Sequence, residues 1–191
     1  MDSKQATMRR VVTGHAADGK AIVLFDDHVP SKVSRADTGI VAHWVWTTDQ
    51  TPADITVTSD TSNVRRGLTP PVGGTIFRVV PPVGGTIFRV VDFPPTSAEV
   101  AAMDHAQVAQ GLGLEMEAGK RYPPNHPLMH FTETIDYAIV LQGQIDMQLD
   151  DSTVTLGPGD LIVQQATNHA WINRGTEICR IAFILISSKP L

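Results

Sequence analysis

The segment from His130 to Phe183 constrains the fold most strongly, because short apolar stretches alternate in it with turn sequences. The turns have the sequences QG, DDS, GPGD and RGTE. Between two of these turns, Ile145, Met147 and Leu149 alternate with polar residues, which places one face of a strand in a core and the other in water or a cavity. Short strands separated by such turns predict a closed antiparallel β-barrel.

Ionisable and polar side chains recur on one face of two strands in this segment. Alternate residues of a strand share a face, so a regular strand over residues 130–140 groups its even-numbered residues. In the second strand, His169 shares a face with Trp171 and Asn173. If both faces look into the barrel, they line one cavity with two imidazoles, a carboxylate, an amide and an indole. The predicted catalytic residues are His130, Asp136 and His169, and the predicted substrate-binding residues are Thr132, Thr134, Trp171, Asn173, His126 and Tyr137.

Two of these candidates have alternatives that the sequence leaves open. His126 lies between prolines in the segment Pro123–Pro127, which makes a rigid, extended entry to the first strand. It either reaches the cavity rim as an acid, base or ligand, or is an exposed loop histidine. Tyr137 either shapes the apolar part of the site or faces the outer side of the strand.

Three short motifs in the same segment resemble those of the cupin superfamily. Ile139–Gly143 (IVLQG) resembles the end of the first cupin motif, Gly157–Asp160 (GPGD) the turn between motifs, and His169–Asn173 the second motif. The resemblance implies an all-β, jelly-roll barrel of the cupin type, with an N-terminal hairpin and strands and one short helix added. We expect one structural domain, in which residues 1–106 pack on the barrel and residues 107–191 form its core.

The resemblance also implies a metal site. Cupins usually bind their metal with a His-x-His pair and a Glu in the first motif and one His in the second. In this chain the acidic position falls on Asp136, and the sequence at the His-x-His position is Leu128-Met129-His130. With His169, these residues supply two imidazoles and one carboxylate, which suit one divalent Zn, Mn, Fe or Ni ion. The alternative is that the histidines are hydrogen-bonded barrel residues and no metal binds.

Convergent ionisable groups of this kind favour an enzyme over a binding protein. We expect a lyase or isomerase that dehydrates, decarboxylates or isomerises a carbonyl or hydroxylated metabolite, with Asp136 and one histidine exchanging the proton. The cupin fold also supports a metal-dependent dioxygenase or a non-catalytic small-molecule binder, and the fold alone does not choose among them.

The composition limits the other partners. The chain has 191 residues, 42% of them hydrophobic, and a net charge of −5 without clusters of basic residues. This gives no electrostatic footprint for nucleic acid, and it leaves neutral or mildly cationic small molecules as ligands. No apolar stretch reaches the length of a membrane span, and the single cysteine, Cys179, sits in an apolar run where packing is its expected role. We expect a soluble, cytoplasmic protein.

The N-terminal half predicts further β-structure. Residues 9–12 and 21–25 flank the turn Ala17–Lys20 and predict a hairpin, and residues 40–47 predict another strand. Residues 70–80 and 81–91 are the same sequence, PPVGGTIFRVV, and we expect the second copy to be the one built into the sheet. Residues 96–110, with Ser97 as N-cap, predict a short helix over one barrel mouth. Because the hairpin and open sheets expose edge strands, we expect a homodimer.

Overall fold

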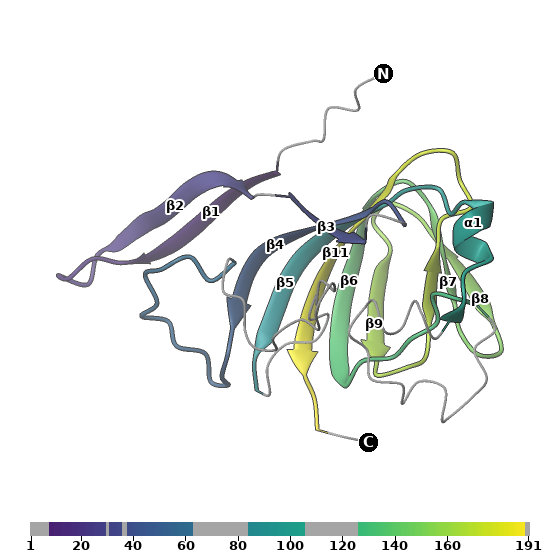
Figure 1. Cartoon of the computed structure of the whole chain (residues 1–191). Helices are drawn as coiled ribbons and strands as arrows, with labels where there is room; N and C mark the ends of the chain where they lie inside the picture. The colour runs from purple at the N-terminus through teal and green to yellow at the C-terminus, as the bar shows by residue number, and fades with distance from the viewer. Residues whose placement is uncertain (1–7, 30, 36–37, 63–83, 106–125, 190–191) are drawn as a thin grey trace, which may run out of the picture.

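The computed structural model describes residues 8–29, 31–35, 38–62, 84–105 and 126–189, and most of these residues lie in antiparallel strands. This confirms the all-β class. A large and a small sheet lie opposite each other (Figure 1), as the jelly-roll expectation requires, and the main apolar core draws side chains from both. The large sheet has the order β3 (Ser31–Arg35), β4 (Ile40–Thr48), β5 (Thr86–Phe93), β11 (Cys179–Ser187), β6 (Thr134–Gln142) and β9 (Leu161–Gln165), and the small sheet has the order β10 (Ala170–Ile172), β7 (Ile145–Gln148) and β8 (Thr153–Leu156).

Strand alternation decides which side chains enter the core. In β11, Cys179, Ile181, Phe183 and Leu185 are buried, and the residues between them lie on the outer face. Cys179 is fully buried, and burial raises the pKa of its thiol to about 11, so the expected packing role is confirmed.

The outer face of the large sheet carries a row of partly exposed apolar side chains. Ile184 pairs directly with Phe88 on one side and with Tyr137 on the other, and Tyr137 pairs with Val163. These four side chains are each between 38% and 60% exposed. The structure therefore places Tyr137 on the outer face and not among the residues that face the barrel interior.

The predicted N-terminal hairpin is confirmed, with strands β1 (Met8–His15) and β2 (Ala21–Val29) that project from one edge of the large sheet (Figure 1). Its anchor is Arg10, whose guanidinium is buried and binds the carboxylates of Asp27 and Asp60. The same guanidinium donates a hydrogen bond to the backbone oxygen of Val45 in β4. A charged hydrogen-bond network therefore fixes the base of the hairpin to the sheet.

The second copy of the repeated sequence is built into the sheet, as expected. The second copy supplies β5, which pairs with β4 on one side and with β11 on the other, so it is an inner strand of the large sheet. The first copy, residues 70–80, lies outside the described residues. Because β4 and β5 belong to the same sheet as the C-terminal strands, the chain before residue 106 contributes directly to the barrel wall.

The helix is shorter than the sequence predicts. Ser97 accepts a hydrogen bond from the backbone nitrogen of Val100, as an N-cap does, but α1 covers only Ala98–Ala101. One turn is enough to bury Val100 against Leu128, Met129, Ala170 and Ile172. Residues 106–110 of the predicted helix lie outside the described residues.

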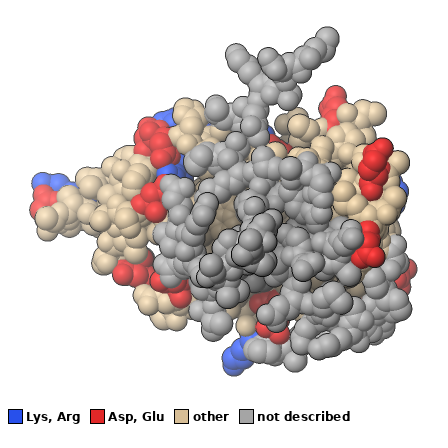
Figure 2. Space-filling model, in the orientation of Figure 1, with Lys and Arg blue, Asp and Glu red and all other residues tan. Residues whose placement is uncertain are grey.

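Charged groups show no large cluster on the face of the molecule in Figure 2. Acidic side chains are spread over the hairpin and the barrel, with a few basic ones among them, in the described part of that face. No helix in the described part of the chain has the length and apolar character that crossing a membrane requires.

Candidate functional site

His130 and His169 lie side by side inside the barrel. Their backbones pair directly, with each backbone nitrogen 2.9 Å from the other residue's oxygen, and their ring centroids are 4.4 Å apart. His130 belongs to a single bridge and not to a regular strand, since β6 begins only at Thr134. The predicted alternation nevertheless holds, because Thr132, Thr134 and Asp136 are all buried.

The environment keeps both imidazoles neutral. Burial lowers the pKa of His130, and burial together with the neighbouring His130 lowers the pKa of His169 well below its ordinary range. Nδ1 of His130 lies 2.8 Å from the backbone oxygen of Leu128, and Nδ1 of His169 lies 3.0 Å from that of Thr167. A carbonyl oxygen only accepts, so each Nδ1 carries the ring proton and each Nε2 keeps a lone pair. Both rings are thereby oriented as bases or as ligands.

Gln164 supports the second histidine and was missed by the sequence analysis. It is buried in β9, and its amide nitrogen lies 3.0 Å from Nδ1 of His169. In this orientation of the amide, its oxygen is buried and has no hydrogen-bond partner in the described part of the chain. Turning the amide by half a turn would offer that oxygen to the Nδ1 proton of His169. The pairing of Gln164 with Asp136 across β9 and β6 links the histidines to the carboxylate.

Asp136 is a buried carboxyl group on the inner face of β6. Burial raises its pKa, and this effect outweighs the opposite effects of a hydrogen bond to Thr134 and of the nearby Arg89. Thr134 in turn shares a hydrogen bond of 2.7 Å with Thr132. The two threonines and Asp136 therefore form a polar row on the inner face, in which the two threonine hydroxyls are hydrogen-bonded to each other. One carboxyl oxygen, Oδ1 of Asp136, is buried and finds no hydrogen-bond partner among the residues that the structure describes.

Arg89 on β5 is the second residue that the sequence analysis missed. It pairs across the sheet with Phe183, and its guanidinium lies 5.7 Å from the centroid of that ring. Burial lowers its pKa to about 10, and its charge acts on the pKa values of Asp136, His130 and His169 alike. The signal in the sequence was the alternation of Arg89 with Ile87 and Val91, which puts an arginine on the apolar inner face.

The predicted three-ligand metal set is only partly assembled. Within the described residues, no three His, Cys, Asp or Glu side chains form a group that could hold a metal ion. The two imidazoles are adjacent, but Asp136 does not join them closely enough to complete the set. The described residues therefore do not fit a three-ligand centre, and metal binding stays a prediction.

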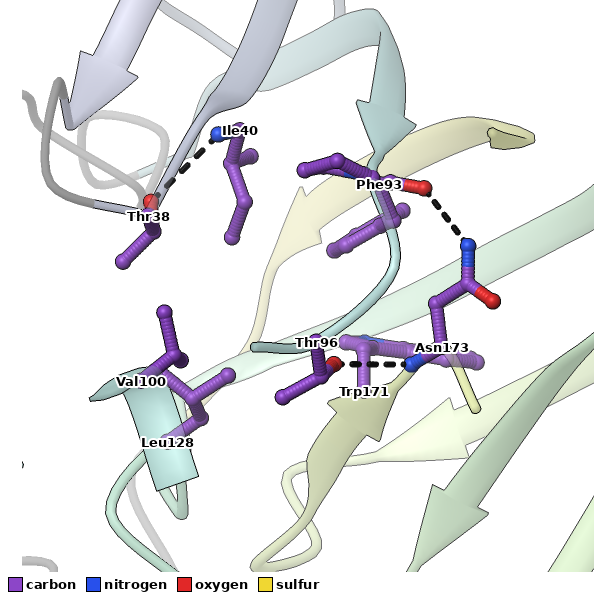
Figure 3. Close-up of a pocket in the computed structure, with 9 residues that line it drawn as sticks. Thr38, Ile40, Phe93, Thr96, Val100, Leu128, Trp171 and Asn173 are labelled. Atoms are coloured by element: carbon purple, nitrogen blue, oxygen red, sulfur yellow. Dashed lines mark hydrogen bonds between the residues drawn. The ribbon is translucent and has the colours of Figure 1, made fainter. Parts of the chain in front are cut away.

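Trp171 connects this polar cluster to a small pocket beside α1. Its ring contacts those of His169 and Phe183, with centroids 5.7 and 5.5 Å away. Figure 3 shows the pocket, which Trp171 lines together with Phe93, Val100 and other residues near α1. Its volume is about 10 Å³, which is about the space one water molecule needs.

Asn173 borders this pocket but serves the structure. Its amide nitrogen donates to the backbone oxygens of Phe93 and Glu177, and its side-chain oxygen accepts from the backbone nitrogen of Gly175. Its backbone exchanges hydrogen bonds with Thr96 (Figure 3). These bonds tie the end of β10 to the end of β5, so the predicted substrate-binding role is not supported by a free polar atom.

His126 lies apart from the histidine pair. It is half-buried, its Nδ1 accepts a hydrogen bond from the backbone nitrogen of Leu128, and its backbone oxygen accepts from Met129. Burial, followed by the charge of Arg174, lowers its pKa. Arg174 binds Asp146 at the small sheet, whereas the inner histidines respond to Arg89. His126 thus stabilises the turn that leads into the site.

Comparison with known proteins gives a consistent assignment. A family model described as a cupin domain matches residues 114–186. The phomopsin biosynthesis cluster protein C' of Diaporthe leptostromiformis is 30% identical over 97% of this chain and 81% of its own length. The cupin-domain-containing oxidoreductase fogC of Aspergillus ruber is 26% identical over 95% of this chain and 73% of its own length.

A similar solved structure is that of the polyketide cyclase RemF from Streptomyces resistomycificus. It is 15% identical, with a TM-score of 0.43, and the match covers 85% of this chain and 77% of that one.

Proposed function

Because the chain belongs to the cupin superfamily, we propose that it is an enzyme that moves a proton on a small carbonyl or hydroxylated metabolite inside its barrel. The reaction class is a dehydration, decarboxylation or isomerisation. Relatives named for phomopsin biosynthesis support a substrate that is an intermediate of a biosynthetic pathway.

The observation that carries the proposal is the pair of neutral imidazoles whose Nε2 atoms keep their lone pairs. Leu128 and Thr167 hold the Nδ1 protons of the two rings, and burial keeps the rings from taking up a second proton from solvent. A neutral imidazole of this kind accepts a proton from a substrate carbon or hydroxyl group. His130 keeps partial exposure, so it is the ring that a substrate meets first.

Asp136 and Arg89 supply the two other functions that the reaction needs. The raised pKa of Asp136 makes it a better proton donor near neutral pH than an exposed carboxyl group is, so it returns the proton to the substrate. The Arg89 cation stabilises the negative charge that develops on a substrate oxygen when the proton leaves. The rings of Trp171 and Phe183 exclude water from this region and contact the apolar part of the substrate.

The test is deuterium uptake from D₂O, measured by NMR on a panel of carbonyl and hydroxylated compounds. Replacing His169 by Ala or Asp136 by Asn is expected to slow the exchange by about 10²-fold or more. His126→Ala is the matched control and is expected to cost less, because that ring lies outside the cluster. An essential His126 together with a dispensable Asp136 would show that the site has been assigned to the wrong residues.

A second candidate function is an oxidoreductase, and the observation that favours it is the name of relatives such as fogC. Metal analysis of the purified protein separates the candidates. Stoichiometric Fe or Cu, with oxygen consumption during turnover, supports an oxidoreductase. Zn, Mn or Ni supports a lyase or isomerase, and a protein without metal is either a metal-independent acid/base catalyst or a non-catalytic binder.

A further inference from the structure

Two charged side chains of the barrel interior each hold a buried polar atom that has no hydrogen-bond partner among the described residues. The atoms are Nε of Arg89, which is a donor, and Oδ1 of Asp136, which is an acceptor. Asp136 as a whole residue is only 5% exposed. A buried polar atom without a partner costs about 1–3 kcal/mol, so a donor and an acceptor of this kind in one region call for an explanation.

Strand register places Arg89 and Asp136 on neighbouring levels of the inner face. Arg89 pairs with Phe183, Leu185 is two residues further along β11, and Leu185 pairs with Asp136. Asp136 pairs in turn with Gln164 on the neighbouring strand. Arg89 and Asp136 influence each other's pKa, yet no direct ion pair joins them in the described part of the chain. The guanidinium contacts a phenyl ring instead of a carboxylate.

The unpartnered atoms define the chemistry of a missing ligand. An arginine donor inside a barrel calls for an anionic acceptor, and its planar fork matches a carboxylate. The orphaned oxygen of Asp136 calls for a donor on the same ligand, such as a hydroxyl group. Arg89 and His130 both keep partial exposure, which gives a ligand access to this region from outside.

We propose that the substrate is a hydroxycarboxylic acid whose carboxylate binds Arg89 and whose hydroxyl group donates to Asp136. This rests on the proposed function, because it names the substrate class of the same site. It also revises the expectation, drawn from the net charge of −5, that the ligand is neutral or cationic. An anion bound beside Asp136 raises the pKa of its carboxyl group further, which favours the protonated form that returns a proton to the substrate.

The experiment measures binding, without turnover, by isothermal titration calorimetry. The probes are mandelate and the smaller lactate, each compared with its amide, which lacks the charge, and with phenylacetate and propionate, which lack the hydroxyl group. We expect each hydroxy acid to bind at least about tenfold more tightly than its amide and more tightly than the acid without the hydroxyl.

Variants then assign the effect to the residue. Arg89→Met keeps an unbranched, apolar side chain without the guanidinium charge, and it is expected to remove the preference for acid over amide, while Arg89→Lys keeps part of it. Arg174→Met is the matched control, since that arginine is 65% exposed and binds Asp146 away from the site. It should leave the preference unchanged. Circular dichroism verifies that each variant is folded.

The outcomes separate this proposal from the proposed function. Acid binding that depends on Arg89 in a protein with no proton-exchange activity would support the ligand class and overturn the enzyme. Exchange that depends on His169 but is equally fast with neutral substrates, and equally fast in Arg89→Met, would overturn the ligand class alone. The ligand class is also overturned if neither hydroxy acid binds better than its amide to the wild-type protein.

Discussion

Replacing Gly143 by alanine is expected to destabilise the barrel by more than its backbone conformation explains. Gly143 is the last residue of the IVLQG motif, in the turn between β6 and β7, with φ of +73°. A Cβ atom there would lie 2.6 Å from the backbone oxygen of Ile178 and 2.9 Å from Cα of Cys179. Backbone atoms cannot move aside as the end of a flexible side chain does, so the turn and the start of β11 must separate.

Gly159 is the matched control, because it also has a positive φ, +91°, but a Cβ atom would meet nothing within 4 Å. The left-handed conformation costs a residue with a side chain about 1–2 kcal/mol, and both variants bear that cost. Overpacking adds about 1–3 kcal/mol at Gly143 alone. We therefore expect losses in the free energy of unfolding of about 2–5 kcal/mol for Gly143→Ala and about 1–2 kcal/mol for Gly159→Ala.

Urea denaturation, followed by circular dichroism, measures both losses. The chain has 191 residues, so each kcal/mol lost corresponds to a fall in Tm of about 2–4 °C. Equal losses for the two variants would refute the reasoning, because they would show that the close approach of residues 178 and 179 to the turn does not constrain position 143.

Three further predictions concern pH, the repeat and assembly. Burial lowers the pKa of His169, so below about pH 6.5 the unfolded chain binds a proton at this ring that the folded protein does not bind. The free energy of unfolding therefore falls there by at most about 1.4 kcal/mol per pH unit. Urea denaturation at several pH values should show a shallower dependence on pH in His169→Gln, and an unchanged dependence would contradict a neutral ring. Deleting Pro70–Val80 should leave cooperative thermal unfolding, since the second copy already supplies β5, and loss of cooperativity would show that the first copy is also needed. We expect a homodimer by light scattering over a range of concentrations, because the hairpin and the edge strands offer pairing sites, and a monomer throughout that range would reject it.

The sequence predicted what depends on local rules. The alternation of residues predicted the inner face of β6 correctly. The regular strand begins four residues later than expected, but the alternation of buried residues continues through the irregular start. The hairpin, the strand over residues 40–47 and the N-cap at Ser97 were also predicted, and the observed β4 ends one residue later, at Thr48. Turn residues and caps act within a few positions, so the local sequence reveals them. The length of α1 was not, because it depends on how much apolar surface the neighbouring strands leave to cover.

The sequence predicted those residues of the site that belong to a recognisable motif, and it did not predict the others. His130 and His169 carry a resemblance to a family, and the structure brings their rings together. Arg89 and Gln164 belong to strands that join the site only through pairing with β11 and β6, and no local pattern reveals that register. Asn173 shows the opposite error, because a residue in a motif can be fully used by backbone hydrogen bonds.

A polar cluster and a group of aromatic rings lie next to each other in the barrel interior, and we expect this difference to orient a substrate. Aromatic rings of Phe93, Trp171 and Phe183 contact one another across the core between the small pocket and the polar cluster. Trp171 contacts both regions, since it lines the pocket and its ring contacts that of His169. A substrate that places a charged group at Arg89 must therefore turn its apolar part toward these rings, because the reverse orientation would bury the charge without a partner. The same constraint brings the carbon or hydroxyl group beside the charged group to the imidazoles, where the proposed proton transfer occurs.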